Sequence, residues 1–387
     1  MNGISQEELR WLTSPEAENG WLFALTLGKL DEERKYLNNI IENSPDNVNG
    51  LLLSGYLNSR AESEGESFRE ELLDQIATSK PQLAFGCTWR GKATHRGVVR
   101  TVGLVKSRSV PLERLRMLTY GGWLKSLSDE DAISIAQSMF DIGGEGMLQA
   151  SMETVHQIIL NRPELVNAME PLIWKLLAFR PSRNWHLEDW EWGQLAQQVA
   201  QHDPEKTIEI VLSFFELDWF VPLEDDGRMI ALKLATEKEP ELAWTLIGDA
   251  IIAGGKIASG LIVALSRWYG ELIPINILID WATRNRPQGP WVVARFLPVR
   301  PTISDKVRAL LTSFPHDQNV KSQLSANLYT GGFVGPISGR TQSNIDLVRV
   351  WTEDPTPVVR AWASELLDGL EKELAHQKII EEEEEDG

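Results

Sequence analysis

Apolar residues recur with helical spacing in several separate stretches of the chain. After Asp354, six of them lie at i, i+3, i+4, i+7, i+8 and i+11, which places all six on one helical face: Val359, Trp362, Ala363, Leu366, Leu367 and Leu370. The same spacing occurs at residues 208–215 and 275–282, and with an offset of one residue at 36–41. Residues 98–105 show a weak alternation of period two. The pattern as a whole predicts an all-α fold.

Proline-containing turns separate these stretches and predict short helices joined by tight connections, about 18 in number and roughly 10 to 18 residues long. No exact repeat period holds along the chain, so any repeats are degenerate. Amphipathic helix pairs must bury their apolar faces on their neighbours. Without strands, they stack most simply into an α-solenoid of degenerate helical hairpins. A compact helical bundle is the alternative architecture.

Composition along the chain predicts four segments. They are N-terminal helical hairpins at 1–78, a basic, glycine-containing irregular segment at 79–109, a HEAT-like helical array at 110–376 with a glycine-rich loop at 330–341, and an acidic tail at 377–387. The segment 79–109 is compatible with a loop, a pair of short helices or a small hairpin. The tail contains an unbroken acidic run, Glu381 to Asp386, and we expect it to be solvated and disordered.

The C-terminal part of the chain resembles known helical repeats. The run Asp354-Pro-Thr-Pro-Val-Val-Arg-Ala-Trp-Ala is similar to the entry into the second helix of a HEAT-type repeat. With the preceding glycine-rich stretch and the acidic tail, it resembles the helical C-terminal regions of large bacterial antiviral proteins, including STAND-type NTPases. The resemblance covers about 50 residues and implies a sensing or scaffolding role, with no catalytic residue to carry over.

Cysteine usage and hydropathy bound the cellular setting. Cys87 is the one cysteine, which excludes an intramolecular disulfide and a zinc site built from cysteines. The N-terminal residues lack the basic and apolar regions of a secretory signal, and no apolar stretch is long enough for a membrane span. We therefore expect a cytoplasmic protein that is neither secreted nor inserted into a membrane.

Charge is strongly uneven along the chain. The net charge is −18, yet residues 79–112 hold seven basic residues and no acid. Within this stretch a combination of flat and cationic side chains could seat phosphates or an acidic protein surface: Trp89, Arg90, Lys92, Arg96 and Arg100, with His95 nearby. The alternative is that these charges pair with acids on neighbouring helices.

A second basic stretch lies at residues 281–304. Arg284 and Arg286 are the candidate binding residues there, accompanied by Arg295 and Arg300 and by three aromatic residues, Trp281, Trp291 and Phe296. Aromatic residues in such a helical stretch are more often part of the core.

Catalytic chemistry has no candidate constellation in the sequence. The six histidines are scattered, no pair of them has helical metal-ligand spacing, and no nucleophile motif occurs. We expect no metal and no cofactor. The leading hypothesis is a non-catalytic protein-binding scaffold or sensor in a bacterial antiviral defence or signalling complex. The alternatives are a nucleic-acid-binding accessory subunit that uses residues 80–108, and an enzyme whose site is assembled only in three dimensions.

Overall fold

The computed structural model describes residues 4–14, 17, 20–47, 50–180, 189–217, 225–266, 268–330 and 337–385. All regular secondary structure in these ranges is helical, with 23 α-helices and three short 3₁₀-helices. This confirms the prediction of an all-α fold. Contacts between residues divide the chain into two units, residues 1–195 and 196–387, which are described separately.

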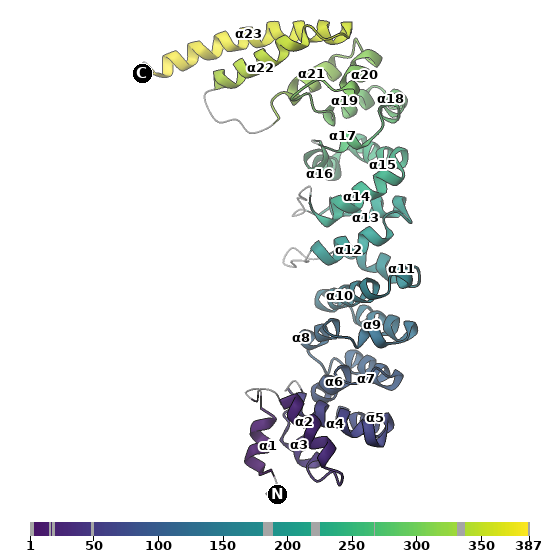
Figure 1. Ribbon diagram of the computed structural model, residues 1–387. Helices are drawn as coiled ribbons and strands as arrows, with labels where there is room; N and C mark the ends of the chain where they lie inside the picture. The colour runs from purple at the N-terminus through teal and green to yellow at the C-terminus, as the bar shows by residue number, and fades with distance from the viewer. Residues whose placement is uncertain are drawn as a thin grey trace. The chain divides into compact units, whose positions relative to one another are not determined.

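The first unit contains α1 to α11, the three 3₁₀-helices and the start of α12 (Figure 1). Their bounds are α1 Gln6–Leu12, α2 Gly20–Leu30, α3 Leu37–Asn43, α4 Leu51–Glu64, α5 Glu66–Ala77, α6 Pro81–Trp89, α7 His95–Lys106, α8 Leu112–Leu115, η1 Arg116–Thr119, η2 Leu124–Ser126, α9 Asp129–Ile142, α10 Glu145–Asn161, η3 Pro163–Leu165, α11 Val166–Leu177 and α12 Asp189–Val199.

Helices α2 and α4 approach closely because glycines lie at their contact. A Cβ atom on Gly28 would stand 2.7 Å from the carbonyl oxygen of Tyr56, and one on Gly55 would stand 2.7 Å from that of Trp21. Asp31, at the end of α2, accepts hydrogen bonds from the Lys35 and Tyr36 amides and from the Tyr56 hydroxyl. The two helices and the turn after α2 therefore form one well-packed corner of the unit.

The basic segment 79–109 is a pair of helices, α6 and α7, joined by a short connection. This was one of the three conformations left open by its sequence, so the description of the segment as irregular is wrong for most of its length. The weak alternation at 98–105 did not signal a strand. The buried positions of α7 include Val98, Thr101, Leu104 and Val105, and these recur with helical spacing.

The second unit contains the end of α12 and the helices α13 to α23. Their bounds are α13 Pro204–Phe214, α14 Gly227–Lys238, α15 Pro240–Ala253, α16 Gly255–Leu265, α17 Tyr269–Leu272, α18 Ile275–Arg284, α19 Gln288–Arg295, α20 Asp305–Ser313, α21 Gln318–Asn327, α22 Ile337–Trp351 and α23 Pro357–Glu385.

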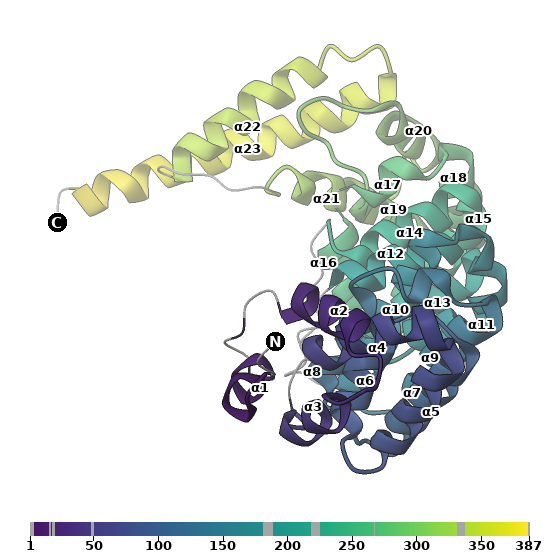
Figure 2. The same cartoon turned by 60° about the horizontal axis from the view of Figure 1, so that its bottom comes forward.

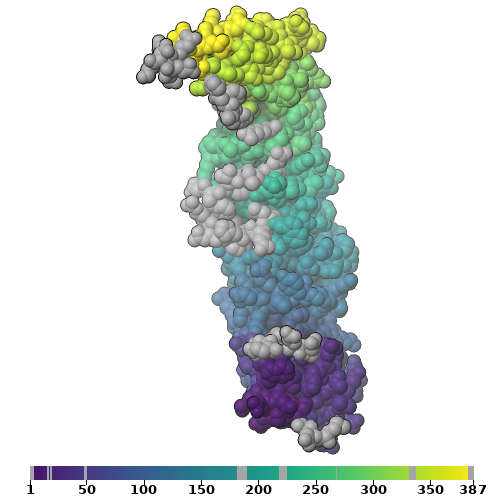
Figure 3. Space-filling view, turned by 60° about the vertical axis from the view of Figure 1, so that its left-hand side comes forward, coloured from purple at the N-terminus to yellow at the C-terminus, as the bar shows by residue number. Residues whose placement is uncertain are grey.

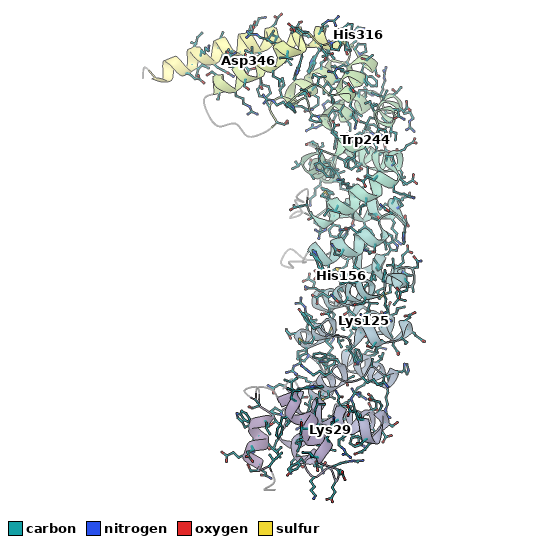
Figure 4. All side chains as sticks on the ribbon, in the orientation of Figure 1. Lys29, Lys125, His156, Trp244, His316 and Asp346 are labelled. Atoms are coloured by element: carbon teal, nitrogen blue, oxygen red, sulfur yellow. The ribbon has the colours of Figure 1, made fainter. Side chains whose placement is uncertain are left out.

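An aromatic cluster centred on Trp244 of α15 forms part of the core of the second unit (Figure 4). The Trp244 ring meets Trp281 and Phe296 edge-on at centroid distances of 5.5 and 5.4 Å, and it stacks on Tyr269 at 6.4 Å. Offset and edge-on arrangements of this kind stabilise aromatic pairs beyond simple burial. Trp281 and Phe296 are thus core residues, in agreement with the alternative considered for them.

The Asp354-Pro-Thr-Pro run forms the turn between α22 and α23. Asp354 is buried and accepts a hydrogen bond from the Thr356 amide, and its carboxylate pairs with Arg308 of α20 at 2.9 Å. Helices α22 and α23 lie side by side (Figure 2), with Trp351 stacked on Trp362 at 5.6 Å. The motif therefore forms the entry into α23, and its Asp354 also binds α20 through Arg308.

Two predicted irregular regions differ from the structure. Helix α23 continues to Glu385, so the prediction of a disordered tail is wrong for residues 377–385, and Glu381 accepts hydrogen bonds from both the amide and the hydroxyl of Ser338. The predicted loop at 330–341 ends earlier than expected, because α22 begins at Ile337. Residues 331–336 lie outside the described ranges.

The main helix contacts of each unit join elements that are close in chain order. In the first unit α4 packs on α5, α5 on α6, α6 on α7, and α9 on α10. In the second unit α13 packs on α14, α15 on α16, α18 on α19, and α22 on α23. Figure 3 shows this order within the first unit as purple passing into blue.

Candidate functional site

A buried ion network joins α5, α6 and α7. Arg100 donates from Nη2 to Glu70 Oε2 at 2.5 Å, from Nε to Asp74 Oδ1 at 2.7 Å, and from Nη1 to Thr88 Oγ1 at 2.8 Å. Arg96 donates to the other oxygen of Asp74 at 2.6 Å. The carboxylates of α5 thus bind two of the predicted binding residues, Arg96 and Arg100, as the alternative of pairing with neighbouring helices expected.

The other three predicted residues of the segment line one cavity. It has a volume of about 710 Å³ and is bounded by the connection between α6 and α7, the starts of α2 and α4, and residues 121–126. Trp89, Arg90 and Lys92 lie on one wall, with Trp21 and Leu51 among the other lining residues. None of the described residues that line it is acidic. We call this cavity the cation–aromatic pocket.

Arg90 is the best-defined cation of the pocket. Its guanidinium lies over the ring of Trp89, 4.0 Å from the ring centroid, and its Nη1 donates to the Gly86 carbonyl at 3.1 Å. Burial, together with the nearby charge of Arg114, lowers the pKa of Arg90, although a guanidinium stays protonated in proteins. The pocket therefore holds a permanent, partly desolvated positive charge, and such a charge favours an anionic ligand.

Arg69 of α5 holds the loop that carries Arg90 and Lys92. Its guanidinium donates to the carbonyls of Cys87 and Thr88, at the end of α6, and to that of Lys92, at 3.2 to 3.3 Å. Gly91 makes this possible, because a Cβ there would stand 1.8 Å from the Arg69 Nη2 atom. The ion network beneath the pocket thus positions the pocket wall.

A further wall of the pocket comes from a glycine-containing turn at residues 121–126. Gly121 has φ 101°, a conformation that favours glycine, and Gly121, Gly122 and Trp123 line the cavity with Ser126. Trp21 could not be recognised as a pocket residue from the sequence, because it lies 68 residues before Trp89 in the chain and joins the pocket only through folding.

The two candidate binding residues of the second basic stretch, Arg284 and Arg286, do not form a comparable site. Arg284 Nη2 lies 3.7 Å from Glu241 Oε1 in an exposed ion pair, and the Arg286 guanidinium lies over the Phe314 ring at 4.8 Å. Neither residue is among those that line the cation–aromatic pocket. Their contacts are those of surface side chains.

Metal-ligating and nucleophilic side chains of the described residues do not gather at the pocket. Among them, no group of three or more His, Cys, Asp or Glu side chains could hold a metal ion. Cys87 is buried, and burial raises the pKa of its thiol to about 11, which keeps it from acting as a thiolate nucleophile near neutral pH. His95 is exposed and its Nδ1 lies 2.7 Å from Asp131 Oδ1.

Comparison with known proteins leaves the site to be interpreted from its own geometry. No family model, curated protein or solved structure matches the chain. Within the described ranges, no helix combines the length and apolar character that a membrane crossing requires. What the geometry defines is an all-helical protein with a pocket that presents flat rings and fixed positive charge and whose described lining residues include no acid.

Proposed function

We propose that this protein is a non-catalytic scaffold, an α-solenoid of HEAT-like hairpins, that binds another protein through the cation–aromatic pocket. The observation that carries the proposal is the stacking of Arg90 on Trp89 beside Lys92, in a cavity that the described residues line without an acid, on a chain with net charge −18. A pocket of this composition fits an acidic peptide segment that also carries apolar or aromatic side chains.

The solenoid part of the proposal is supported by packing between helices that are near in sequence and by the helix entry at Asp354. In repeat architectures each helical hairpin contacts mainly its neighbours. We place the protein in a reducing, cytoplasmic compartment, since its single thiol is buried and unpaired with another cysteine.

The biological setting is proposed on the resemblance alone. Residues 328–367 are similar to the helical ends of bacterial antiviral proteins, in which a solenoid senses or scaffolds. We therefore propose a role in a defence or signalling complex, where a partner supplies any catalytic activity.

An acidic peptide is favoured over a nucleic acid as the ligand, because Arg96 and Arg100 are paired with carboxylates of α5. A nucleic-acid groove needs a row of cations that can face successive phosphates. Because Arg96 and Arg100 are paired with carboxylates, the segment 80–108 presents a local pocket and not a continuous row of cations.

The test is fluorescence anisotropy with three labelled probes: a peptide of alternating Glu and Phe, its Lys and Phe counterpart, and a single-stranded oligonucleotide. We expect the acidic peptide to bind, and Arg90→Gln with Lys92→Gln to weaken it by at least about tenfold, or 1.4 kcal/mol. The matched control is Lys106→Gln with Arg108→Gln, which removes the same charge from two exposed residues at the other end of α7.

Equal losses in the two double variants would mean that only net charge matters, and the pocket would then have no specific role. Preferential binding of the oligonucleotide, with an affinity that falls steeply as salt rises, would replace this proposal with the nucleic-acid alternative. Binding of the basic peptide instead would contradict the charge argument.

A further inference from the structure

A smaller cavity in the second unit brings two arginines together. It has a volume of about 330 Å³ and lies among the end of α16, the chain that follows α19, and α21. Arg295 and Arg300 line it, together with apolar side chains and the polar residues Ser266, Gln323 and Thr330. None of its described lining residues is acidic, and we call it the two-arginine pocket.

Each arginine is held by a neutral partner. The Arg295 guanidinium lies over the Trp291 ring, 4.9 Å from its centroid, and Arg300 donates to the Oδ1 atom of Asn344, a fully buried residue of α22. Neither is paired with a carboxylate of the described residues. A cation held by a ring face and an amide keeps its full positive charge for a further partner.

This arrangement differs from that of the most buried arginines. Acids outnumber basic residues by 56 to 38 in the chain, and the most buried arginines each pair with one or more of them: Arg60 with Glu64, Arg69 with Glu66 and Glu70, Arg100 with Glu70 and Asp74, and Arg228 with Asp226. Arg295 is partly buried and Arg300 is exposed. Two guanidiniums that have no carboxylate partner among the described residues give this cavity a positive charge that an anionic ligand can neutralise.

The backbone around the pocket is fixed by Asn327 of α21. Its side-chain amide donates to the carbonyls of Ala294 and Leu297 at 2.8 and 3.0 Å, and its Oδ1 accepts from Gln323 Nε2 at 2.8 Å. These bonds bridge the end of α19 and the chain leading to Arg300. The backbone that carries the two arginines is therefore preorganised, which lowers the ordering cost of binding.

The helix dipole accounts for only one of the two arginines. Arg295 is the last residue of α19, where a cation interacts favourably with the negative end of the helix dipole. Arg300 lies beyond the helix, so the dipole does not explain why it lines the same cavity.

We infer that the two-arginine pocket binds a phosphate monoester group. Planar guanidinium forks match the oxygens of a phosphoryl group, and two positive charges match its charge of about −1.5 to −2 at neutral pH. The Ser266 hydroxyl on the wall is a further possible donor. The cavity volume is at the lower end of small-ligand pockets, which suits a phosphate and its first attached carbon atoms. This inference is independent of the acidic-peptide proposal.

The experiment is a titration of the full chain with inorganic phosphate at constant ionic strength, followed by calorimetry and by the thermal midpoint, with sodium chloride as the reference salt. We expect saturable binding and a rise of the midpoint with phosphate concentration, because a ligand that binds only the folded state stabilises it. Arg295→Gln should lower the phosphate affinity at least about tenfold, which is the effect of losing 1.4 kcal/mol of binding energy.

Arg286→Gln is the matched control, because Arg286 also lies over an aromatic ring, Phe314, in the same unit but outside the cavity. It should bind phosphate like the unmodified protein. Arg300→Lys keeps the positive charge but not the planar fork, and its phosphate affinity should lie between those of the unmodified protein and Arg295→Gln. Circular dichroism confirms that each variant is folded. Arg90→Gln with Lys92→Gln should leave phosphate affinity unchanged, which separates this site from the cation–aromatic pocket.

Titrations with O-phosphoserine and with adenosine 5′-monophosphate distinguish the two sources of such a group, a modified protein and a nucleotide. Tighter binding of either one than of inorganic phosphate supports the inference and assigns the source. Phosphate effects no larger than those of chloride, or an equal loss in Arg286→Gln and Arg295→Gln, would overturn it.

Discussion

Arg100 of α7 and Glu70 of α5 form an ion pair that is almost completely shielded from water, with 2.5 Å between Nη2 and Oε2 and side-chain exposures of 2% and 5%. Glu70 also pairs with Arg69 at 3.2 Å, so one carboxylate connects the two arginines that hold α6 and the pocket wall. Part of the basic segment 79–109 is therefore buried in the interface between helices α5, α6 and α7.

Replacing Arg100 by Met tests this role. The change leaves Glu70 without one of its two cations in a buried position, and we expect the free energy of unfolding to fall by about 3 kcal/mol or more. Urea denaturation followed by circular dichroism measures the difference. Arg96→Met removes a cation that is half exposed and should cost less than about 1 kcal/mol. Similar losses in both variants would contradict the distinction between the two arginines.

The buried face of α7 shows what could be predicted from the sequence and what could not. The conformation of residues 79–109 was left open by their sequence, whereas residue type singles out Trp89, Arg90 and Lys92 as candidate binding residues. Residue type cannot separate these three from Arg96 and Arg100, because the separation depends on acids of α5, two helices earlier in the chain.

Contacts between residues far apart in the chain could not be predicted from the sequence either. The entry into α23 at Asp354 was predictable from its proline run, whereas its pairing with Arg308, 46 residues earlier, was not. The acidic tail was predicted to be disordered because a run of glutamates cannot pack against apolar neighbours. The structure instead supplies Glu381 with the polar donors of Ser338.

Gly270 provides a second stability prediction. A Cβ atom at this position would stand 2.1 Å from the backbone carbonyl oxygen of Phe296, so Gly270→Ala forces α17 away from the aromatic cluster. We expect a loss of about 1–3 kcal/mol, as for other overpacked sites, measured by chemical denaturation.

The control for Gly270 is Gly369→Ala in the same unit. Gly369 lies in α23 with nothing within 4 Å of the added methyl group, and alanine has a higher helix propensity by up to about 1 kcal/mol. This variant should be as stable as the unmodified protein or more stable. Destabilisation by Gly369→Ala would show that the space available for a Cβ atom at these two glycines does not determine the change in stability.

His156 of α10 predicts a pH dependence of stability. The side chain is buried and packs edge-on against Trp190 at a centroid distance of 4.7 Å, and burial lowers its pKa below the ordinary value of 6.5. The unfolded chain therefore takes up a proton at a higher pH than the folded one. Stability should decrease as the pH falls below 6.5 toward the lowered pKa and then become independent of this residue.

Unfolding free energies measured at pH 7.5 and pH 5.5 in the unmodified protein and in His156→Asn check this dependence. The variant should lose less stability between the two pH values, because asparagine does not titrate. An unchanged difference would mean that other groups cause the pH dependence.

The clasp between Ser338 and Glu381 predicts a local effect. Glu381 accepts from the Ser338 amide at 3.0 Å, and these hydrogen bonds to Ser338 lower the pKa of its carboxyl group. Glu381→Ala should speed hydrogen exchange of the Ser338 amide, because its acceptor is lost. Glu365→Ala, which removes a carboxylate on α23 that pairs with Lys321, should leave this amide unaffected. Exchange monitored by NMR or mass spectrometry distinguishes the two.

The neighbour-to-neighbour packing of the helices has a consequence for synthesis of the protein. Helices α4 to α7 each find their principal partner no more than two helices away in the chain, so a segment emerging from the ribosome can bury its apolar face before the remainder is translated. The newly made N-terminal half would then expose little apolar surface to other molecules before its C-terminal half is synthesised.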